Sequence, residues 1–245
     1  MSSVPAAERG PRRFRPQLLP TLLTLLVLAV LIGLGTWQMQ RLAWKEALTA
    51  TIETRLGGPP APLAELLAEP PAADFRRVRL TGHYLHDRAF AFGTFARGGE
   101  FGARLVTPLR MPAGAVLLVD RGWLPEALLP PERPAELLPA GEVTLTAVLR
   151  FRGDERALPF TPDNRPVERR WFWWDLPAMA AAVGDDLLPV VAVLDAPDGP
   201  GPLPRVEPVR FELANNHLGY AMTWYGLALG LLAVYVALSL QPREP

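Results

Sequence analysis

The chain has 245 residues, a formal net charge of zero and no cysteine. A neutral chain lacks the basic surface typical of nucleic-acid binders, and the absence of cysteine excludes disulfides, thiolate nucleophiles and cysteine-held metals. Because 49% of the residues are hydrophobic, membrane-spanning segments are the first feature to look for.

The first apolar segment lies near the N-terminus. No ionisable side chain occurs from Pro16 to Gln40. About 20 apolar residues in a helix cross the roughly 30 Å of a bilayer core. This run is longer than the apolar part of a signal peptide, and no cleavage motif follows it, so it predicts a transmembrane helix over residues 18–40. Helical spacing continues through Trp44, and the glycines and prolines of residues 57–60 are expected to end the helix.

A second apolar segment lies near the C-terminus. No Asp, Glu, Lys or Arg occurs between Glu212 and Arg243. Tyr220, Trp224 and Tyr225 stand at its beginning, and such aromatic residues concentrate at membrane interfaces. The segment predicts a second transmembrane helix, which with its entry motif covers residues 213–240.

Charges beside the two spans predict their orientation. Four arginines and one glutamate fall within the first 15 residues. Positive residues beside a first span stay in the cytoplasm, and two spans return the chain to the same side. We therefore expect both termini in the cytoplasm and the middle segment outside, which in a bacterium means the periplasmic side of the inner (plasma) membrane.

The middle segment has the pattern of short strands joined by turns. Pro112, Ala113 and Gly114 predict a hairpin turn, and Asp175 is expected to cap a short helix that Gly184 ends. The proline-rich residues 124–139 predict a surface loop. The expected strands are residues 76–82, 89–93, 103–111, 115–122, 143–151, 171–174 and 188–194.

These elements predict an α+β membrane protein. Two transmembrane helices flank an antiparallel, β-rich extracytoplasmic domain, and a small barrel is one way to close its sheet. The expected organisation is a cytoplasmic tail (1–17), the first transmembrane helix (18–40), the periplasmic β-rich domain (41–212), the second transmembrane helix with its entry motif (213–240) and a second cytoplasmic tail (241–245).

The middle domain lacks a recognisable catalytic set. His83 and His86 are three residues apart at a predicted strand end, where their side chains point to opposite faces, so exposed histidines are favoured over a metal pair. Serine occurs only at Ser2, Ser3 and Ser239, which excludes a serine hydrolase in this domain. The motifs of nucleotide binding and of the nucleophile elbow are also missing.

The residues that could bind a metal or a cofactor lie where the predicted spans leave the membrane. His217 begins the second span, and Tyr220 and Trp224 are predicted to share its helical face. An ionisable residue at the head of a span is a functional candidate, and neutral imidazole is a common iron ligand. A histidine that bonds a backbone carbonyl or a lipid headgroup fits the same pattern. On the first span, Arg41 can meet an anionic group, a haem propionate or a lipid phosphate, and Trp37 can be an interfacial anchor or part of a cofactor slot.

Three stretches resemble the motifs of one family. Residues 35–45 (GTWQMQRLAWK) are similar to its G-x-W-Q-x-x-R-x-x-W-K signature. Residues 120–125 (DRGWLP) resemble its N-R-G-W-V/I-P motif, with aspartate in place of the asparagine. Residues 215–225 (NNHLGYAMTWY) resemble its N-N-H-x-x-Y-A-x-T-W-Y motif. Residues 160–164 and 171–175 also fit the family pattern. The chain is identified as a member of the surfeit-locus-one (Surf-one) family, whose members are assembly factors for cytochrome c oxidase.

This resemblance implies a role in maturing the haem-copper oxidase. The implied cofactor is haem a, bound transiently, and its implied recipient is subunit I of the oxidase. Haem A synthase is a second implied partner. The spans are expected to lie in the lipid bilayer, and no nucleic acid is expected to bind. His217 matches the family histidine proposed as an axial ligand of the haem iron. The further cofactor-binding residues expected around it are Tyr220, Trp224, Trp37 and Arg41. The resemblance implies no enzymatic activity.

Three other functions can be compared with haem delivery. A scaffold without haem could use the same motifs for helix packing while it steadies an oxidase subunit. An enzyme that modifies haem is disfavoured, because such membrane enzymes commonly carry several histidines across a larger helical bundle. A copper chaperone is also disfavoured, since the chain has no cysteine and its five methionines are dispersed.

Overall fold

The computed structural model describes residues 12–130, 137, 139–151, 160–184, 186–199, 201–209, 211, 213 and 215–242. The chain divides into two compact units, one formed by residues 1–50 with 212–245 and the other by residues 51–211. Each unit is described by itself.

Two long helices make up most of the first unit. Helix α1 (Leu18–Gly57) has 40 residues and helix α5 (His217–Ser239) has 23. Both are long and apolar enough to cross a membrane, and only 6% and 11% of the residues in their most apolar stretches are buried. That exposure is unlike the buried core helix of a soluble protein. Helix α1 ends at Gly57, as the following glycine and prolines predicted.

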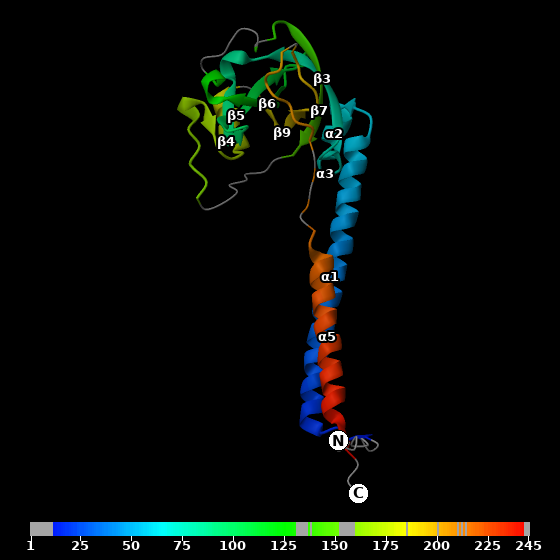
Figure 1. Cartoon of the computed structure of the whole chain (residues 1–245). Coiled ribbons are helices and arrows are strands. Elements are labelled where there is room, and N and C mark those ends of the chain that lie inside the picture. Colours follow the sequence, from blue (N-terminus) through cyan, green and yellow to red (C-terminus); the bar gives the residue numbers. More distant parts are fainter. Residues whose placement is uncertain are drawn as a thin grey trace, which may run out of the picture. The chain divides into compact units, whose positions relative to one another are not determined.

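Helices α1 and α5 lie side by side and antiparallel (Figure 1). At one end, the Thr21 hydroxyl is 2.6 Å from the hydroxyl of Tyr235. Near the middle, the buried Gly35 faces the ring of Tyr225. On α5, the small residues Ala221 and Ala228 are buried. Small residues at such a seam let two helix backbones approach closely.

A short β-ribbon joins the two ends of the first unit. Strands β1 (Arg12–Phe14) and β10 (Leu240–Pro242) are antiparallel, with Phe14 opposite Leu240. The Arg15 amide donates to the Ser239 carbonyl at 2.8 Å. This ribbon ties the start of α1 to the end of α5.

Five strands of the second unit close into a barrel, which confirms the expected β-rich fold. The barrel order is β3–β7–β9–β6–β5, and Tyr84 pairs with Leu109 to join β5 back to β3. The strands are β3 (Arg77–Tyr84), β5 (Glu100–Arg110), β6 (Val116–Pro125), β7 (Glu142–Arg150) and β9 (Leu187–Leu194).

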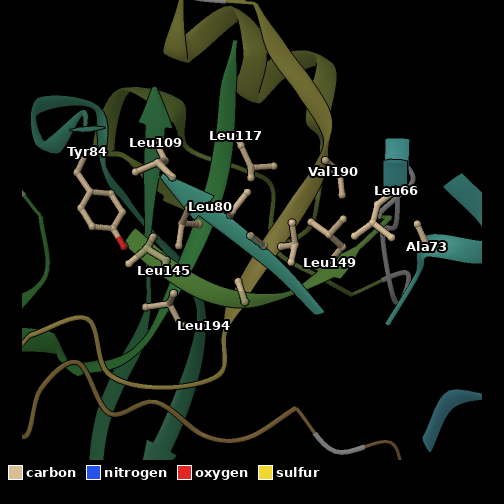
Figure 2. Packing of buried hydrophobic residues seen from close by; sticks show 14 residues of the cluster. Leu66, Ala73, Leu80, Tyr84, Leu109, Leu117, Leu145, Leu149, Val190 and Leu194 are labelled. Atoms are coloured by element: carbon tan, nitrogen blue, oxygen red, sulfur yellow. The ribbon is translucent and has the colours of Figure 1, made fainter. Parts of the chain in front are cut away.

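Apolar residues at every second strand position fill the barrel (Figure 2). Leu80 of β3, Leu117 of β6 and Leu149 of β7 are almost completely buried. Strand β6 is buried on both faces, because Leu118 packs in a second cluster with Met179 of the helix α4 (Leu176–Val183). This explains why β6 begins with a continuous apolar run, residues 116–119, rather than an alternating one.

Smaller elements surround the barrel. Strand β2 (Ala61–Pro62) pairs with β3, and strands β4 (Phe90–Arg97) and β8 (Arg170–Trp171) extend the sheet beyond β5. Other helical segments of the described residues are α2 (Leu63–Ala68), α3 (Pro70–Ala73) and the 3-10 turns η1 (His86–Arg88), η2 (Glu126–Leu128) and η4 (Pro166–Glu168).

Local signals for turns and caps are confirmed. The hairpin between β5 and β6 turns at Gly114, whose amide donates to Met111. Asp175 caps α4 by accepting from the Ala178 amide at 3.0 Å, and Gly184 ends the helix in a left-handed conformation. These residues act through bonds within a few positions of themselves, which is why the sequence predicted them.

The expectation of an antiparallel sheet is wrong for three strand pairs of the described residues. At the margins of the sheet, β2 with β3 and β4 with β8 are parallel. Strands β6 and β9 run parallel, with Leu118 opposite Val191, while the other four neighbours in the barrel are antiparallel. Strand directions cannot alternate all the way round a closed ring with an odd number of strands. A five-stranded barrel therefore needs at least one parallel pair.

Two local predictions also need correction. The predicted strand 171–174 shrinks to β8, because the Asn164 side chain accepts the amides of Phe172 and Trp173 that a strand would use. The predicted surface loop 124–139 begins inside β6, and its Leu129 and Leu137 are buried beside β4 and β5. Residues 131–136 and 138 of that segment lie outside the described residues.

Candidate functional site

The arrangement around His217 is set by two helix positions. His217 is the first residue of α5, and Gln38 faces it from α1. The His217 Nδ1 is 2.6 Å from the Oε1 of Gln38. A carboxamide oxygen only accepts hydrogen bonds, so the Nδ1 carries the proton and donates it. In this tautomer the Nε2 has a free lone pair.

The Nε2 of His217 is buried and has no hydrogen-bond partner. A buried polar atom without a partner costs about 1–3 kcal/mol, and most native proteins avoid this cost. An unpaired lone pair on imidazole is also the form that binds a metal ion. The site thus holds one nitrogen ligand already in the required tautomer.

Two cations on α1 lie within electrostatic range of His217. They are Arg41 and Lys45, three and seven residues after Gln38 and on the same helical face. The Arg41 guanidinium carbon lies 4.1 Å from the ring centre of Trp44, so the side chain stacks on that indole. This face of α1 therefore offers positive charge to an anionic group that approaches the histidine.

The other predicted residues are distributed unevenly around His217. Trp37 and Tyr220 are exposed, at 54% and 58%, and Trp224 is half-buried. Ala221 occupies the buried seam of α5 instead. The structure thus brings His217 together with Gln38 and the two cations, while the exposed aromatic side chains are turned toward the surroundings of the helix pair.

Sequence reasoning missed Gln38 as the partner of His217. The residue stands inside the G-x-W-Q stretch that carries the resemblance, but a glutamine in a span draws less attention than its tryptophan or arginine neighbours. Its spacing to Arg41 and Lys45 was an available signal. What the sequence lacked was the register of α5 against α1, which alone places a residue opposite His217.

The central D-R-G-W motif lies in strand β6, in the wall of the barrel. Arg121 and Asp198 form a buried ion pair, each with 1% side-chain exposure. The Arg121 Nε and Nη2 donate to the two carboxylate oxygens at 2.6 and 3.1 Å. The Tyr84 hydroxyl also donates to Asp198, at 2.7 Å. Burial, and then the Asp198 charge, raise the pKa of Tyr84 well above its usual range.

The neighbours of Arg121 shape the backbone of β6. Arg121 and Gly122 together oppose only Leu105 of β5, so β6 contains a β-bulge here. Gly122 has a φ of +112°, and a Cβ there would lie 2.5 Å from the carbonyl oxygen of Arg205. Trp123 exchanges two backbone hydrogen bonds with Arg205. Gly122 therefore lies in a β-bulge, and the contacts that the structure gives the motif are all within the second unit.

No group of three or more metal-ligating side chains occurs in the described part of the chain. His83 is exposed on β3, while the Nε2 of His86 is 2.9 Å from the carbonyl oxygen of Pro139. The prediction of exposed histidines is confirmed for His83 and wrong for His86, which is half-buried at the start of η1.

Comparison with known proteins agrees with the motifs. The model of the SURF1 family matches residues 25–229. A SURF1-like protein of Monosiga brevicollis is 35% identical over 221 residues, which cover 85% of this chain and 83% of the relative. Surfeit locus protein 1 of Mus musculus is 33% identical and that of Homo sapiens 32%, each over 83% of this chain and over 70% and 72% of the relatives. The chain therefore belongs to the SURF1 family, the surfeit-locus-one family that its motifs resemble.

Proposed function

We propose that this protein is a membrane-anchored assembly factor for haem-copper cytochrome c oxidase, and that it helps haem a reach subunit I. The oxidase role rests on what the family resemblance implies. The observation that carries the haem role is the buried Nε2 of His217, which has no partner while Nδ1 is held by Gln38.

The proposal includes insertion of both helices into a bilayer. Helices α1 and α5 expose long apolar surfaces, and lipid is the solvent that such surfaces suit. The arginines before α1 favour a cytoplasmic location for both termini. The barrel domain then lies outside, on the periplasmic side of a bacterial inner membrane, with His217 at the outer end of α5.

The residues around His217 fit a haem that is held briefly. His217 would supply one axial nitrogen, and Gln38 orients its ring. Arg41 and Lys45 would attract the propionates, and Trp37, Tyr220 and Trp224 offer aromatic surface at the same level. When bound, haem a supplies the redox centre that the oxidase needs, and the chain itself performs no turnover. A single axial histidine gives exchangeable ligation, which suits delivery rather than storage.

A second candidate function is a scaffold without haem. One observation favours it: protein atoms cover the Nε2 of His217, so a haem iron could reach this atom only after neighbouring side chains turn aside. In that case His217 and Gln38 would simply pair α5 with α1 while the barrel steadies an oxidase subunit. Subunit I is the proposed partner in both cases, and haem A synthase only in the first.

The deciding experiment is an optical spectrum of the detergent-purified chain, made in cells with an active haem a pathway. Wild type is compared with His217→Ala and with His83→Ala, a control at an exposed histidine on β3. We expect a haem band in wild type and in the control that is lost or strongly reduced in His217→Ala.

The other results are also informative. Wild type without haem, from cells whose oxidase is filled, would support the scaffold. Equal haem in wild type and His217→Ala would keep the carrier role but remove His217 from the site. Co-purification of subunit I with wild type, and not of an unrelated membrane protein made at the same level, tests the proposed partner in either case.

A further inference from the structure

Three polar contacts between side chains join α1 to α5 in the described residues, and one differs from the others. Two of them, Thr21 with Tyr235 and Thr36 with Tyr225, pair hydroxyl groups at 2.6 and 3.3 Å. Hydroxyl groups can donate or accept, so these contacts impose no proton position. The third, between His217 Nδ1 and Gln38 Oε1 at 2.6 Å, has only one direction, from the imidazole to the amide oxygen.

The proton position on His217 has a consequence at the far side of its ring. A neutral imidazole carries one N–H, so a proton held on Nδ1 leaves Nε2 as an acceptor. That Nε2 is buried and meets no donor. The opposite tautomer would leave an Nε2–H equally unpaired and would also face the glutamine oxygen with a bare nitrogen, so the Gln38 contact keeps the proton on Nδ1 and the lone pair on Nε2.

We propose that Gln38 is a positioning residue for metal ligation. It fixes His217 as the Nδ1–H tautomer and so keeps Nε2 unprotonated for the iron of a haem. This inference rests on the proposed haem role and deepens it. Metal-bound histidines commonly donate their second N–H to an oxygen acceptor, which fixes the ring and makes the ligating nitrogen more basic. Gln38 supplies such an acceptor from the opposite helix.

The proposal is tested first without haem. The full-length chain, labelled with nitrogen-15 histidine and held in detergent micelles, contains only three histidines, so replacing His83 and His86 by Gln identifies the signals of His217. At about pH 8.5, two units above the ordinary histidine pKa, the nitrogen shifts report which ring nitrogen holds the proton. We expect an unprotonated Nε2 and a protonated Nδ1 in wild type.

Two variants of Gln38 separate positioning from packing. Gln38→Leu removes the acceptor at similar size, and should let the proton move to Nε2 in part or in full. Gln38→Glu keeps an acceptor oxygen and should preserve the wild-type tautomer. Tyr235→Phe is the control, because it removes another cross-helix hydrogen bond of 2.6 Å without touching His217. It should leave the His217 signals unchanged.

The second test uses hemin as the probe. We expect Gln38→Leu to weaken hemin binding by about 10–100-fold, as is usual for residues that support a metal ligand, and Gln38→Glu to bind like wild type. In the ferrous complexes, resonance Raman spectra should show an iron–histidine stretch that falls in Gln38→Leu and rises in Gln38→Glu. A purely structural role would not produce this opposite pair of shifts.

The two tests separate failure of the inference from failure of the proposed function. A wild-type His217 that carries its proton on Nε2, or a tautomer unchanged by Gln38→Leu, would overturn the role of Gln38 even if haem binds. A wild type that binds neither hemin nor haem a would defeat the haem proposal and with it the ligation role of Gln38, whatever tautomer the apo-protein shows.

Discussion

The barrel and the helix pair bury opposite kinds of residues. The barrel buries large apolar side chains such as Leu80 and Leu117, and it encloses the Arg121–Asp198 ion pair. The helix pair buries small residues, including Gly35 and Ala221, and leaves most of its leucines exposed. In water, burying large apolar groups drives folding, whereas in lipid that drive is lost and close backbone packing takes its place. The contrast agrees with the proposal that the helix pair inserts into a bilayer while the barrel folds in water.

The largest expected effect comes from breaking the buried ion pair of the barrel. Arg121→Met leaves the Asp198 carboxylate buried without its cation, which typically costs about 3–5 kcal/mol. We expect a matching loss in the free energy of unfolding, measured by urea denaturation with tryptophan fluorescence. Arg165→Met, which breaks the exposed pair with Glu168, should cost at most about 1 kcal/mol. Equal losses in both variants would contradict a special role for the buried pair.

The next effect concerns the β-bulge in β6. Gly122→Ala forces a side chain into a positive φ, at a cost of about 1–3 kcal/mol, and also pushes its Cβ against the Arg205 carbonyl. Gly114→Ala is the matched control, because Gly114 also has a positive φ but opens onto free space. We expect Gly122→Ala to unfold at clearly lower urea than Gly114→Ala. Identical midpoints would mean that the close approach of Arg205 carries no cost.

A smaller effect is expected in the seam of the helix pair. A Cβ on Gly35 would lie 2.6 Å from the ring of Tyr225, while Gly33 has nothing within 4 Å. Because that ring can turn aside, Gly35→Ala should destabilise by only about 1 kcal/mol, the low end for overpacking. Gly33→Ala should be neutral or slightly stabilising. The two variants can be compared by unfolding in mixed micelles of rising SDS content, followed by far-ultraviolet circular dichroism. A Gly35→Ala variant as stable as Gly33→Ala would argue against this seam.

The smallest effect at neutral pH, where it is absent, is a dependence of barrel stability on alkaline pH. The pKa of Tyr84 is raised by burial and by Asp198, so the folded state resists its ionisation. The stability that this neutral hydroxyl contributes is complete below the ordinary tyrosine pKa of about 10, and it declines above that pH because the unfolded chain ionises first. Tyr84 should contribute a loss of at most about 1.4 kcal/mol per pH unit.

Tyr84→Phe isolates that contribution. Urea unfolding at pH values on both sides of 10 should show a shallower alkaline decline in the variant than in wild type. Parallel declines in the two proteins would show that the Tyr84 hydroxyl does not respond as its burial requires.

Much of the architecture could be predicted because its signals are local. The 40-residue helix α1 follows from an apolar run and ends where Gly57, Gly58 and the prolines stop it. Helix α4 follows from Asp175 at one end and Gly184 at the other. The strand 171–174 failed because Asn164, seven residues before it, takes the amides that a strand needs. That competition has no signature in the strand itself.

The candidate site was predicted in part. His217 stood out because it is the one histidine in an apolar span, and an imidazole there is costly. Gln38 did not stand out. The partner of Arg121 could not be predicted from the sequence, because Asp198 is 77 residues away. Both partners depend on contacts between elements that are distant in the chain.

The sequence by itself determined the two apolar helices, the short strands with their caps and turns, and the family. Each of these depends on periodicity, on single residues such as Gly184, or on contiguous motifs, all of which operate over a few residues. Only the tertiary structure decided the closure of the barrel with its parallel pair, the burial of Arg121 against Asp198, and the placement of Gln38 on the Nδ1 of His217. The physical reason is register: a shift of one residue along a strand or helix turns a different side chain to the same place, and only packing of the whole element fixes that choice.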